Sequence, residues 1–152
     1  MSKITRVLTT AAAAATLVLG AATTASANGN VTWENVAQKS CIANSGNNDA
    51  KMKSCGDWDA QWYDQQESDG SYTQHVRGNA SLCLAAYSNH DVYVEPCTAN
   101  NSWQRFYEHW DKDRGIWRLQ HVQTGWFITV YDNGYRIGVD PYNEVDTKQW
   151  FR

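Results

Sequence analysis

A glutamine separated by one residue from an aromatic ring recurs along the chain and constrains its fold more than any other feature. The three copies are Gln61-Trp62-Tyr63, Gln104-Arg105-Phe106 and Gln149-Trp150-Phe151, spaced 43 and 45 residues apart. A period of this length is typical of repeated supersecondary units that must share one core, because none can bury its apolar face alone. We therefore predict three similar units, each ending at one copy of the motif. The glutamine amides are expected to be structural, satisfying backbone groups at the strand junctions.

Residues 1–27 have the pattern of a secretory signal peptide. Lys3 and Arg6 precede an apolar, alanine-rich stretch, and Ala25-Ser26-Ala27 supplies the small residues of a cleavage site. We therefore expect a secreted, extracellular protein whose mature domain spans residues 28–152. That part holds 11 basic and 16 acidic residues, so it has no basic surface of the kind that binds nucleic acid, and we expect no membrane insertion.

The four cysteines predict two local disulfides. Cys41 and Cys55 are 14 residues apart, as are Cys83 and Cys97, and export places them in an oxidising compartment. Zinc binding is the competing interpretation, but neither a CxxC pair nor a paired-histidine spacing supports it. Each bridge would stabilise so small a domain by roughly 3 kcal/mol.

The mature part is predicted to be all-β. Short segments with alternating character, such as Val92-Tyr93-Val94-Glu95, are separated by polar and glycine-rich turns, and helical periodicity is absent. Gln-His-Val occurs at 74–76 and 120–122, which we take as equivalent positions in two units. In the first unit, residues 45–53 have little β character, so a longer loop and a poorer strand are expected there. Three units of about four strands would form a closed barrel with a hairpin cap, which leaves few exposed edges.

These repeats resemble the ricin-type β-trefoil lectins, whose units end in Gln-x-Trp and often carry one disulfide each. The resemblance covers the mature chain, and the second and third units are most similar to small bacterial lectins of the actinohivin type. Val92-Tyr93 ahead of Pro96-Cys97 and Gln104 matches the closing half of a repeat. The resemblance implies a β-trefoil that binds carbohydrate, with Tyr63, Phe106 and Phe151 as the aromatic core residues in place of tryptophan.

The sequence departs from the family at its sugar-binding positions. The family's aspartate, two residues after the first cysteine of a repeat, is replaced in all three units by Ala43, Ala85 and Thr129. The aromatic platform two residues before the second cysteine is replaced by Lys53, Glu95 and about Gly138. The fold is therefore expected to transfer, whereas the galactose-binding chemistry is not.

A relocated sugar site is predicted in the loops of the second and third units. Sugars stack their apolar face on aromatic rings while amides and carboxylates bind their hydroxyls. The candidate sugar-binding residues are Tyr87, Asn89, Asp91 and Tyr93 in the second unit, and Tyr131, Asp132, Asn133 and Tyr135 in the third. The alternative is that these tyrosines pack on the barrel rim while the polar residues form turns.

Catalytic and metal chemistry have little support in the sequence. Asp57, Asp59, Asp111 and Asp113 could be imagined as an acid/base pair, but solvated acidic turns are far commoner. His75 and His121 fall in the shared tripeptide, which favours a structural role, and the four histidines show no metal spacing. We expect a non-catalytic protein with no metal and no cofactor.

Three functions remain open, of which a small hydrolase has the least support because it would need a perturbed carboxylate pair in a cleft. The first is a monomeric, lectin-like protein with up to three weak sites whose avidity would favour polyvalent glycans. The second is a protein-binding trefoil, either a protease inhibitor or a toxin-associated targeting module, since the sugar aspartate is missing while the aromatic residues persist. Eight tryptophans could fill the barrel or form an exposed aromatic surface for such a partner.

Overall fold

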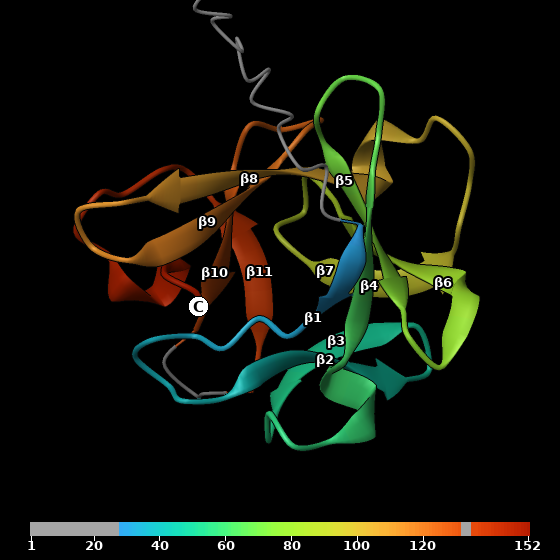
Figure 1. Ribbon diagram of the computed structural model, residues 1–152, viewed down its shortest axis with the longest axis horizontal. Coiled ribbons are helices and arrows are strands. Elements are labelled where there is room, and N and C mark those ends of the chain that lie inside the picture. Colours follow the sequence, from blue (N-terminus) through green and yellow to red (C-terminus); the bar gives the residue numbers. More distant parts are fainter. Residues whose placement is uncertain (1–27, 132–134) are drawn as a thin grey trace, which may run out of the picture.

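A computed structural model describes residues 28–131 and 135–152 of the chain, and Figure 1 shows their arrangement. The predicted signal segment lies outside the described residues. In these two ranges the chain forms strands and 3₁₀ turns without an α-helix, and no helix there is long and apolar enough to cross a membrane. The strands are β1 (Gly29–Val31), β2 (Cys41–Gly46), β3 (Asp49–Lys53), β4 (Trp62–Gln66), β5 (Tyr72–Val76), β6 (Asn79–Ala86), β7 (Val92–Pro96), β8 (Arg105–Asp111), β9 (Ile116–His121), β10 (Phe127–Val130) and β11 (Ile137–Asp140), and the 3₁₀ turns are η1 (Trp58–Ala60), η2 (Ser102–Gln104) and η3 (Thr147–Gln149).

The predicted fold class is confirmed: the chain is an all-β β-trefoil, a barrel capped by three hairpins. Around the barrel, β4 pairs with β1 and β5, β5 pairs with β8, and β8 pairs with β9. The cap consists of the hairpins β2–β3, β6–β7 and β10–β11. These hairpins are joined to one another by the pairs Asp49↔Tyr93, Lys51↔Arg136 and Asp91↔Gly138. Each unit therefore supplies one of the three hairpins that meet in the cap.

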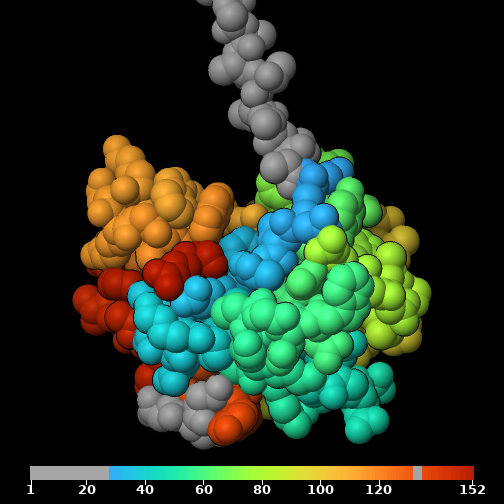
Figure 2. Space-filling model, turned by 60° about the horizontal axis from the view of Figure 1, so that its bottom comes forward, coloured from blue at the N-terminus to red at the C-terminus, as the bar shows by residue number. Residues whose placement is uncertain are grey.

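The two ends of the domain close the barrel. Phe151 bridges Trp117 of β9 on one side and Asn35 on the other. Backbone hydrogen bonds run both ways between Glu34 and Arg152, at 3.1 and 3.0 Å. Figure 2 shows the C-terminal residues lying against the N-terminal segment. Closure pairs backbone groups that would otherwise form an open sheet edge.

The aromatic core residue of the first unit is Trp62, so the prediction for Gln61 and Tyr63 is wrong by one position. Trp62 is fully buried, as are Phe106 and Phe151, whereas Tyr63 is 39% exposed. The three rings each lie two residues after the last residue of a 3₁₀ turn: Ala60, Gln104 or Gln149. Because side chains alternate across a strand, a shift of one residue moves Tyr63 to the outer face.

Only two of the three motif glutamines have the buried structural role. Gln104 Oε1 accepts from the Thr98 amide at 2.8 Å, while its Nε2 donates to Pro96 O at 2.9 Å. Gln149 repeats this pattern with the Asn143 amide at 3.0 Å and Pro141 O at 2.9 Å. Gln61 is partly exposed and accepts instead from the Arg77 guanidinium. In the first unit the buried position is held by Ala60, and the Trp62 indole Nε1 donates to Ile42 O at 2.8 Å.

The two Gln-His-Val tripeptides are also offset by one residue, so His75 and His121 are not equivalent. In strand register, Trp62 faces Val76 whereas Phe106 faces His121. His75 instead pairs with Cys83 of its cap strand β6. The equivalent pairs in the other units are Gln120 with Phe127 and Glu34 with Cys41. The two identical tripeptides are therefore offset by one residue relative to the core aromatic residues that their strands face.

The hairpin of the first unit is tight rather than long, contrary to expectation. Gly46 pairs with Asp49, so the loop between β2 and β3 holds only Asn47 and Asn48. Both asparagines have positive φ, at 52° and 62°. Two consecutive left-handed residues match the right-handed twist of a hairpin, and asparagine tolerates them better than other non-glycine residues.

Both predicted disulfides are present, and no cysteine is free. Cys41, at the start of β2, and Cys83, within β6, are fully buried. Their partners Cys55 and Cys97 are partly exposed. Each bridge ties a cap hairpin to the segment that leads into the next 3₁₀ turn.

We expect Gln104→Ala to lower the free energy of unfolding by roughly 2 kcal/mol, because it removes a buried side chain and leaves the part-buried backbone groups of Thr98 and Pro96 without this partner. Gln61→Ala is the matched control, since Gln61 is partly exposed, and should cost less than about 0.5 kcal/mol. Urea unfolding of both variants measures the difference. Equal losses would contradict the assignment of Gln104 as a core polar residue.

Candidate functional site

A cavity of about 640 Å³ opens where the three cap hairpins meet. Its wall comes from all three units: residues 45–51 of the β2–β3 hairpin, 91–93 of the second unit and 135–137 of the third. We call it the cap cavity. Backbone hydrogen bonds fix its frame, with Met52 N–H donating to Tyr135 O at 2.9 Å and Val94 N–H donating to Asn48 O at 3.2 Å.

Among the described residues that line the cap cavity, the charged side chains form two ion pairs, each with one positive and one negative member. Arg136 Nη2 lies 2.7 Å from Asp91 Oδ1, which links the third unit to the second. Lys51 Nζ lies 2.8 Å from Asp49 Oδ2 within the first unit. All four residues line the cavity. The described part of the site therefore offers both hydrogen-bond donors and acceptors, and its formal charges cancel.

Asn89 and Tyr93 extend this polar group. The Asn89 amide Nδ2 donates to the Tyr93 hydroxyl at 3.1 Å, and that hydroxyl donates to Asp91 Oδ2 at 3.3 Å. Three of the four residues predicted in the second unit thus share one hydrogen-bonded cluster. The cluster holds Asp91 in place through partners on both sides, the amide of Asn89 and the guanidinium of Arg136.

Tyr135 is the exposed aromatic ring of the cap cavity. It is 70% exposed and lines the cavity. Tyr93 also lines the cavity, but its ring is partly buried and packs edge-on against Tyr87 at 5.7 Å. Of the two, Tyr135 is the more exposed ring, and an apolar sugar face could stack on it.

Tyr87 and Tyr131 pack into the protein, as the alternative interpretation of the tyrosine loops holds. Tyr87 stacks on Trp103 at 5.1 Å, and its hydroxyl donates to the Glu95 carboxylate at 2.8 Å. Burial, together with that hydrogen bond, raises the pKa of Tyr87 to about 12. The Arg136 guanidinium lies 4.9 Å from the centre of the Tyr131 ring.

Close packing around Tyr131 also accounts for Gly138. A Cβ at that position would lie 2.3 Å from His90 O and 2.6 Å from Tyr131 Oη, so only glycine fits between them. Asp132 and Asn133, the remaining candidates, lie outside the described residues.

The positions where the lectin family carries its sugar aspartate are closed in this chain. Ala43 and Ala85 are fully buried, and Thr129 is 4% exposed. Glu95, at the platform position, accepts hydrogen bonds from Tyr87 and from Gln104 Nε2 at 2.8 Å. A sugar could not reach Ala43, Ala85 or Thr129 without rearrangement of the strands, and the partly exposed Glu95 is already occupied by its two hydrogen bonds.

Sequence reasoning missed the contribution of the first unit to the cap cavity. Asn47, Asn48, Asp49 and Lys51 line it, although that segment was expected to form a long loop. The adjacent asparagines were the available signal, because such pairs favour two-residue hairpins. A tight hairpin would have placed these residues at the cap, level with the loops of the other two units.

A pair of carboxyl groups inside the barrel, the buried Asp64 and the partly exposed Glu108, was also missed. Asp64 is 3% exposed and hydrogen-bonds to Glu108. Two ionised carboxylates can only accept, so one of the pair must carry a proton. Gln74 Nε2 donates to Glu108 Oε1 at 2.8 Å, and Trp33 Nε1 donates to Gln74 Oε1 at 3.0 Å.

Burial is the main cause of the perturbed acidity of this pair. It raises the pKa of Asp64 to about 7 and that of Glu108 to about 8. Asp64 and Glu108 each follow a core aromatic residue, Trp62 or Phe106, by two positions, so the alternation of a strand directs both inward. Had Trp62 rather than Tyr63 been placed in the core, Asp64 would have been expected to point inward toward Glu108.

The two carboxyls of this pair are hydrogen-bonded to each other, whereas the carboxyls of a glycosidase flank the scissile bond and lie about 5 Å or more apart. The carboxylates considered from sequence are placed differently. Asp111 is bound by Arg114 at 2.9 Å and Arg118 at 3.2 Å, and Asp59 is bound by Lys53 at 2.9 Å.

Comparison with known proteins identifies structural relatives only. No protein-family model matches the sequence, and no curated protein matches it. A mosquitocidal holotoxin is similar in structure, with a TM-score of 0.73 and 13% identity over 82% of this chain and 17% of the toxin. A GlcNAcα1-4Gal-releasing endo-β-galactosidase from Clostridium perfringens is similar with a TM-score of 0.70 and 9% identity, over 81% of this chain and 31% of the enzyme.

The designed three-fold symmetric protein ThreeFoil is also similar, with a TM-score of 0.68 and 15% identity over 82% of this chain and 97% of the design. At these identities the similarity establishes the β-trefoil fold. This chain spans less than a third of the holotoxin and of the endo-β-galactosidase, so it corresponds to one part of each.

We expect the Asp64–Glu108 pair to make the protein less stable as the pH rises from 6 to 9. A carboxyl whose pKa is raised by folding stabilises the protein fully below its unfolded pKa of about 4. That stabilisation is lost as the pH passes the folded values of about 7 and about 8. The loss should be roughly 2–4 kcal/mol, measured by urea unfolding at each pH.

The double variant Asp64→Asn/Glu108→Gln should lack most of this pH dependence, whereas Asp113→Asn, in an exposed turn, should keep it. Burial lowers the pKa of His121 to about 4, so His121 affects stability mainly below pH 6.5 and leaves the chosen range clear. An equal decline in the double variant would show that other groups cause the effect.

Proposed function

We propose that the protein is a secreted, non-catalytic carbohydrate-binding module whose glycan site is the cap cavity. The observation that carries the proposal is the convergence of Asp91, Tyr93 and Tyr135, three residues expected from sequence to bind sugar, in one cavity with the first unit. Carboxylates and an amide there can accept from and donate to hydroxyls, and the exposed Tyr135 ring can stack on the apolar face of a pyranose.

The balanced charges of the cap cavity favour a neutral glycan. Asp49 and Asp91 are already paired with Lys51 and Arg136, so a charged sugar would have to displace one partner of an existing ion pair. A neutral polyhydroxylated ligand can instead add hydrogen bonds to the pairs without breaking them. The cavity volume of about 640 Å³ falls in the range of small-molecule sites.

The structural relatives are compatible with such a module. One of them is an endo-β-galactosidase that releases GlcNAcα1-4Gal, and another is a toxin; in both, the similar part is a fraction of a larger protein. Two disulfides in so small a domain suit an oxidising compartment, which supports export of the chain. The closer resemblance to lectins of the actinohivin type, and a monomeric state, remain predictions from the sequence.

The proposal differs from the three-site expectation in its valence. Each unit supplies one wall of the cap cavity, so the three repeats would build a single site on the three-fold axis rather than three separate sites. Binding would then be monovalent, and avidity for polyvalent glycans would require more than one copy of the chain.

Protein binding is the second candidate function, and exposed aromatic residues favour it. Trp58, Trp110 and Tyr142 are 61%, 53% and 53% exposed. Rings of this kind are enriched among residues that dominate protein interfaces. A partner that binds in the presence of excess sugar, and is lost on Trp58→Ala or Trp110→Ala, would favour this function over glycan binding.

We expect Tyr135→Ala to weaken glycan binding roughly tenfold, because the stacking ring is lost, while the midpoint of thermal unfolding stays within about 2 °C. Tyr63→Ala is the control, since Tyr63 is also exposed but lies on β4, outside the cap cavity. A glycan array selects the sugar, and titration calorimetry compares the three proteins. Unchanged affinity in Tyr135→Ala would reject the cap cavity as the site.

The same titration tests the number of sites. With a monosaccharide or short oligosaccharide chosen from the array, we expect a stoichiometry of one per chain, because one cavity is shared by the three units. A stoichiometry near three would support independent sites in the repeats and contradict the shared cavity. Absence of binding across the array at millimolar sugar would count against carbohydrate binding altogether.

A further inference from the structure

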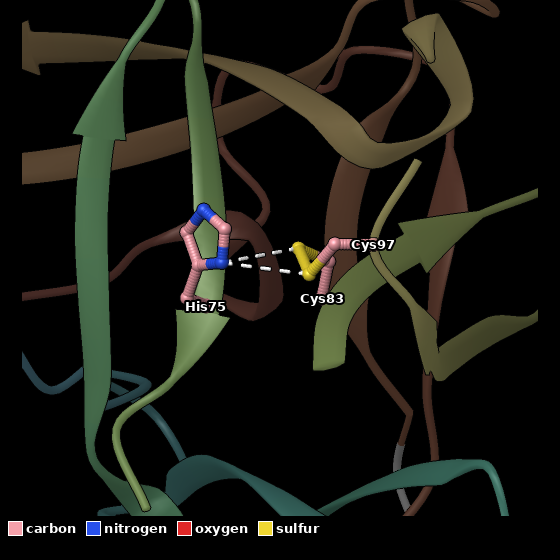
Figure 3. A group of neighbouring side chains, drawn as sticks. All are labelled: His75, Cys83 and Cys97. Carbon is pink, nitrogen blue, oxygen red and sulfur yellow. Dashed lines mark hydrogen bonds between the residues drawn. A yellow bond between two sulfur atoms is a disulfide. The ribbon is translucent and has the colours of Figure 1, made fainter. Parts of the chain in front are cut away.

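The imidazole of His75 lies against the Cys83–Cys97 disulfide. Its Nδ1 is 3.4 Å from Sγ of both cysteines, and Figure 3 shows the ring edge directed at the bridge. His75 belongs to β5 and pairs with Cys83 of β6 across the sheet. Strand register therefore sets this contact, not the chance position of a loop.

The position of the imidazole proton follows from a third contact. Nδ1 also lies 2.9 Å from the backbone oxygen of Ala80. A carbonyl oxygen can only accept a hydrogen bond, so Nδ1 must carry the hydrogen. Nε2 is buried and has no hydrogen-bond partner among residues 28–131 and 135–152. The N–H of the ring thus faces the Ala80 carbonyl and both sulfur atoms.

The proton on Nδ1 also decides whether the site suits metal binding or stabilisation of a thiolate. Nδ1 of His75 and the two sulfurs lie within 4.8 Å of one another, as the ligand atoms of a metal site would. Nδ1 is already protonated, however, and both sulfurs are consumed by the disulfide. A hydrogen-bond donor aimed at a disulfide is suited to stabilise a thiolate formed from it.

The other disulfide provides a natural contrast within the same chain. Glu34 occupies the position of His75 in the first unit, because it bridges Cys41. Its carboxylate is held by Arg152 at 2.8 Å, and that hydrogen bond lowers the pKa of Glu34. An ionised carboxylate has no hydrogen to donate and would repel a thiolate.

The two bridges are alike in the burial of their cysteines. One sulfur partner in each, Cys41 or Cys83, is fully buried, and the other, Cys55 or Cys97, is partly exposed. At Cys97 a cavity of about 180 Å³ opens, lined also by His75, Thr98 and Arg105. A small thiol can reach Cys97 through it.

We propose that Cys83–Cys97 is a site of thiol–disulfide exchange with small-molecule thiols, at which His75 stabilises the leaving sulfur. An incoming thiolate attacks Cys97 Sγ and forms a mixed disulfide there. The bond between the two cysteine sulfurs breaks, and its electron pair passes to Cys83 Sγ. The resulting thiolate is stabilised by the Nδ1–H of His75. Attack by a second thiolate on the mixed disulfide releases the oxidised dimer of the small thiol and completes the reduction.

The test compares the two bridges in one folded protein. The oxidised full-length mature chain is incubated with reduced glutathione in the absence of denaturant, quenched with acid, alkylated and mapped by mass spectrometry. Cys83–Cys97 should open on the order of tenfold faster than Cys41–Cys55, because a stabilised thiolate leaves faster. The glutathione adduct should be found on Cys97 and not on Cys83.

His75→Glu tests the role of the imidazole, since it copies the residue that the first unit has at this position. We expect it to slow the opening of Cys83–Cys97 to within about twofold of Cys41–Cys55. A purely structural role predicts the opposite, because a destabilised β5–β6 pair would expose the bridge and speed its opening. Equal rates for the two bridges in the wild type, or an unchanged or faster rate in His75→Glu, would overturn the proposal.

Discussion

Barrel closure is the constraint on which the rest of this structure depends. Phe151 lies between Asn35 and Trp117, so the C-terminal residues join the N-terminal part of the domain to β9 and close the barrel. Its ring is fully buried with those of Trp62 and Phe106, one from each unit. Burial of three such rings in one core ties the units together, since none could bury its own aromatic residue. Once the barrel is closed, the cap hairpins are brought together at one end.

Polar groups are largely shielded from solvent inside the barrel but remain exposed to solvent in the cap cavity. Inside the barrel, burial raises the pKa of both Asp64 and Glu108, and Gln74 and Trp33 belong to the same hydrogen-bonded group. In the cap cavity, Asp91 and Arg136 are also paired but remain open to solvent. Desolvated groups are costly unless satisfied, whereas partly hydrated ones can exchange partners with a ligand. This difference is why we propose ligand binding for the cap and expect pH-dependent stability from the barrel.

Much of the fold followed from local patterns in the sequence, and errors arose where register decided the outcome. The disulfides and the all-β class follow from spacing and alternation. The motif of the first unit, however, was placed on Gln61 and Tyr63 instead of Ala60 and Trp62, and His75 was equated with His121. Each error is a single residue, and a single residue reverses the face of a strand. Pairing between strands fixes that register, and the Gln-x-aromatic motif in the sequence does not reveal it.

The candidate site was predictable in part for the same reason. Asp91, Tyr93 and Tyr135 were identified by type and by position in their loops, since exposed polar and aromatic loop residues suit sugar recognition. The sequence by itself determined the threefold repeat, the disulfide pairing and this set of chemical groups, because each depends on residues near one another in the chain. Only the tertiary structure decided that the groups share one cavity, that Asp64 meets Glu108 and that His75 faces a disulfide. Those contacts join strands far apart in sequence, and they exist only once the barrel has closed.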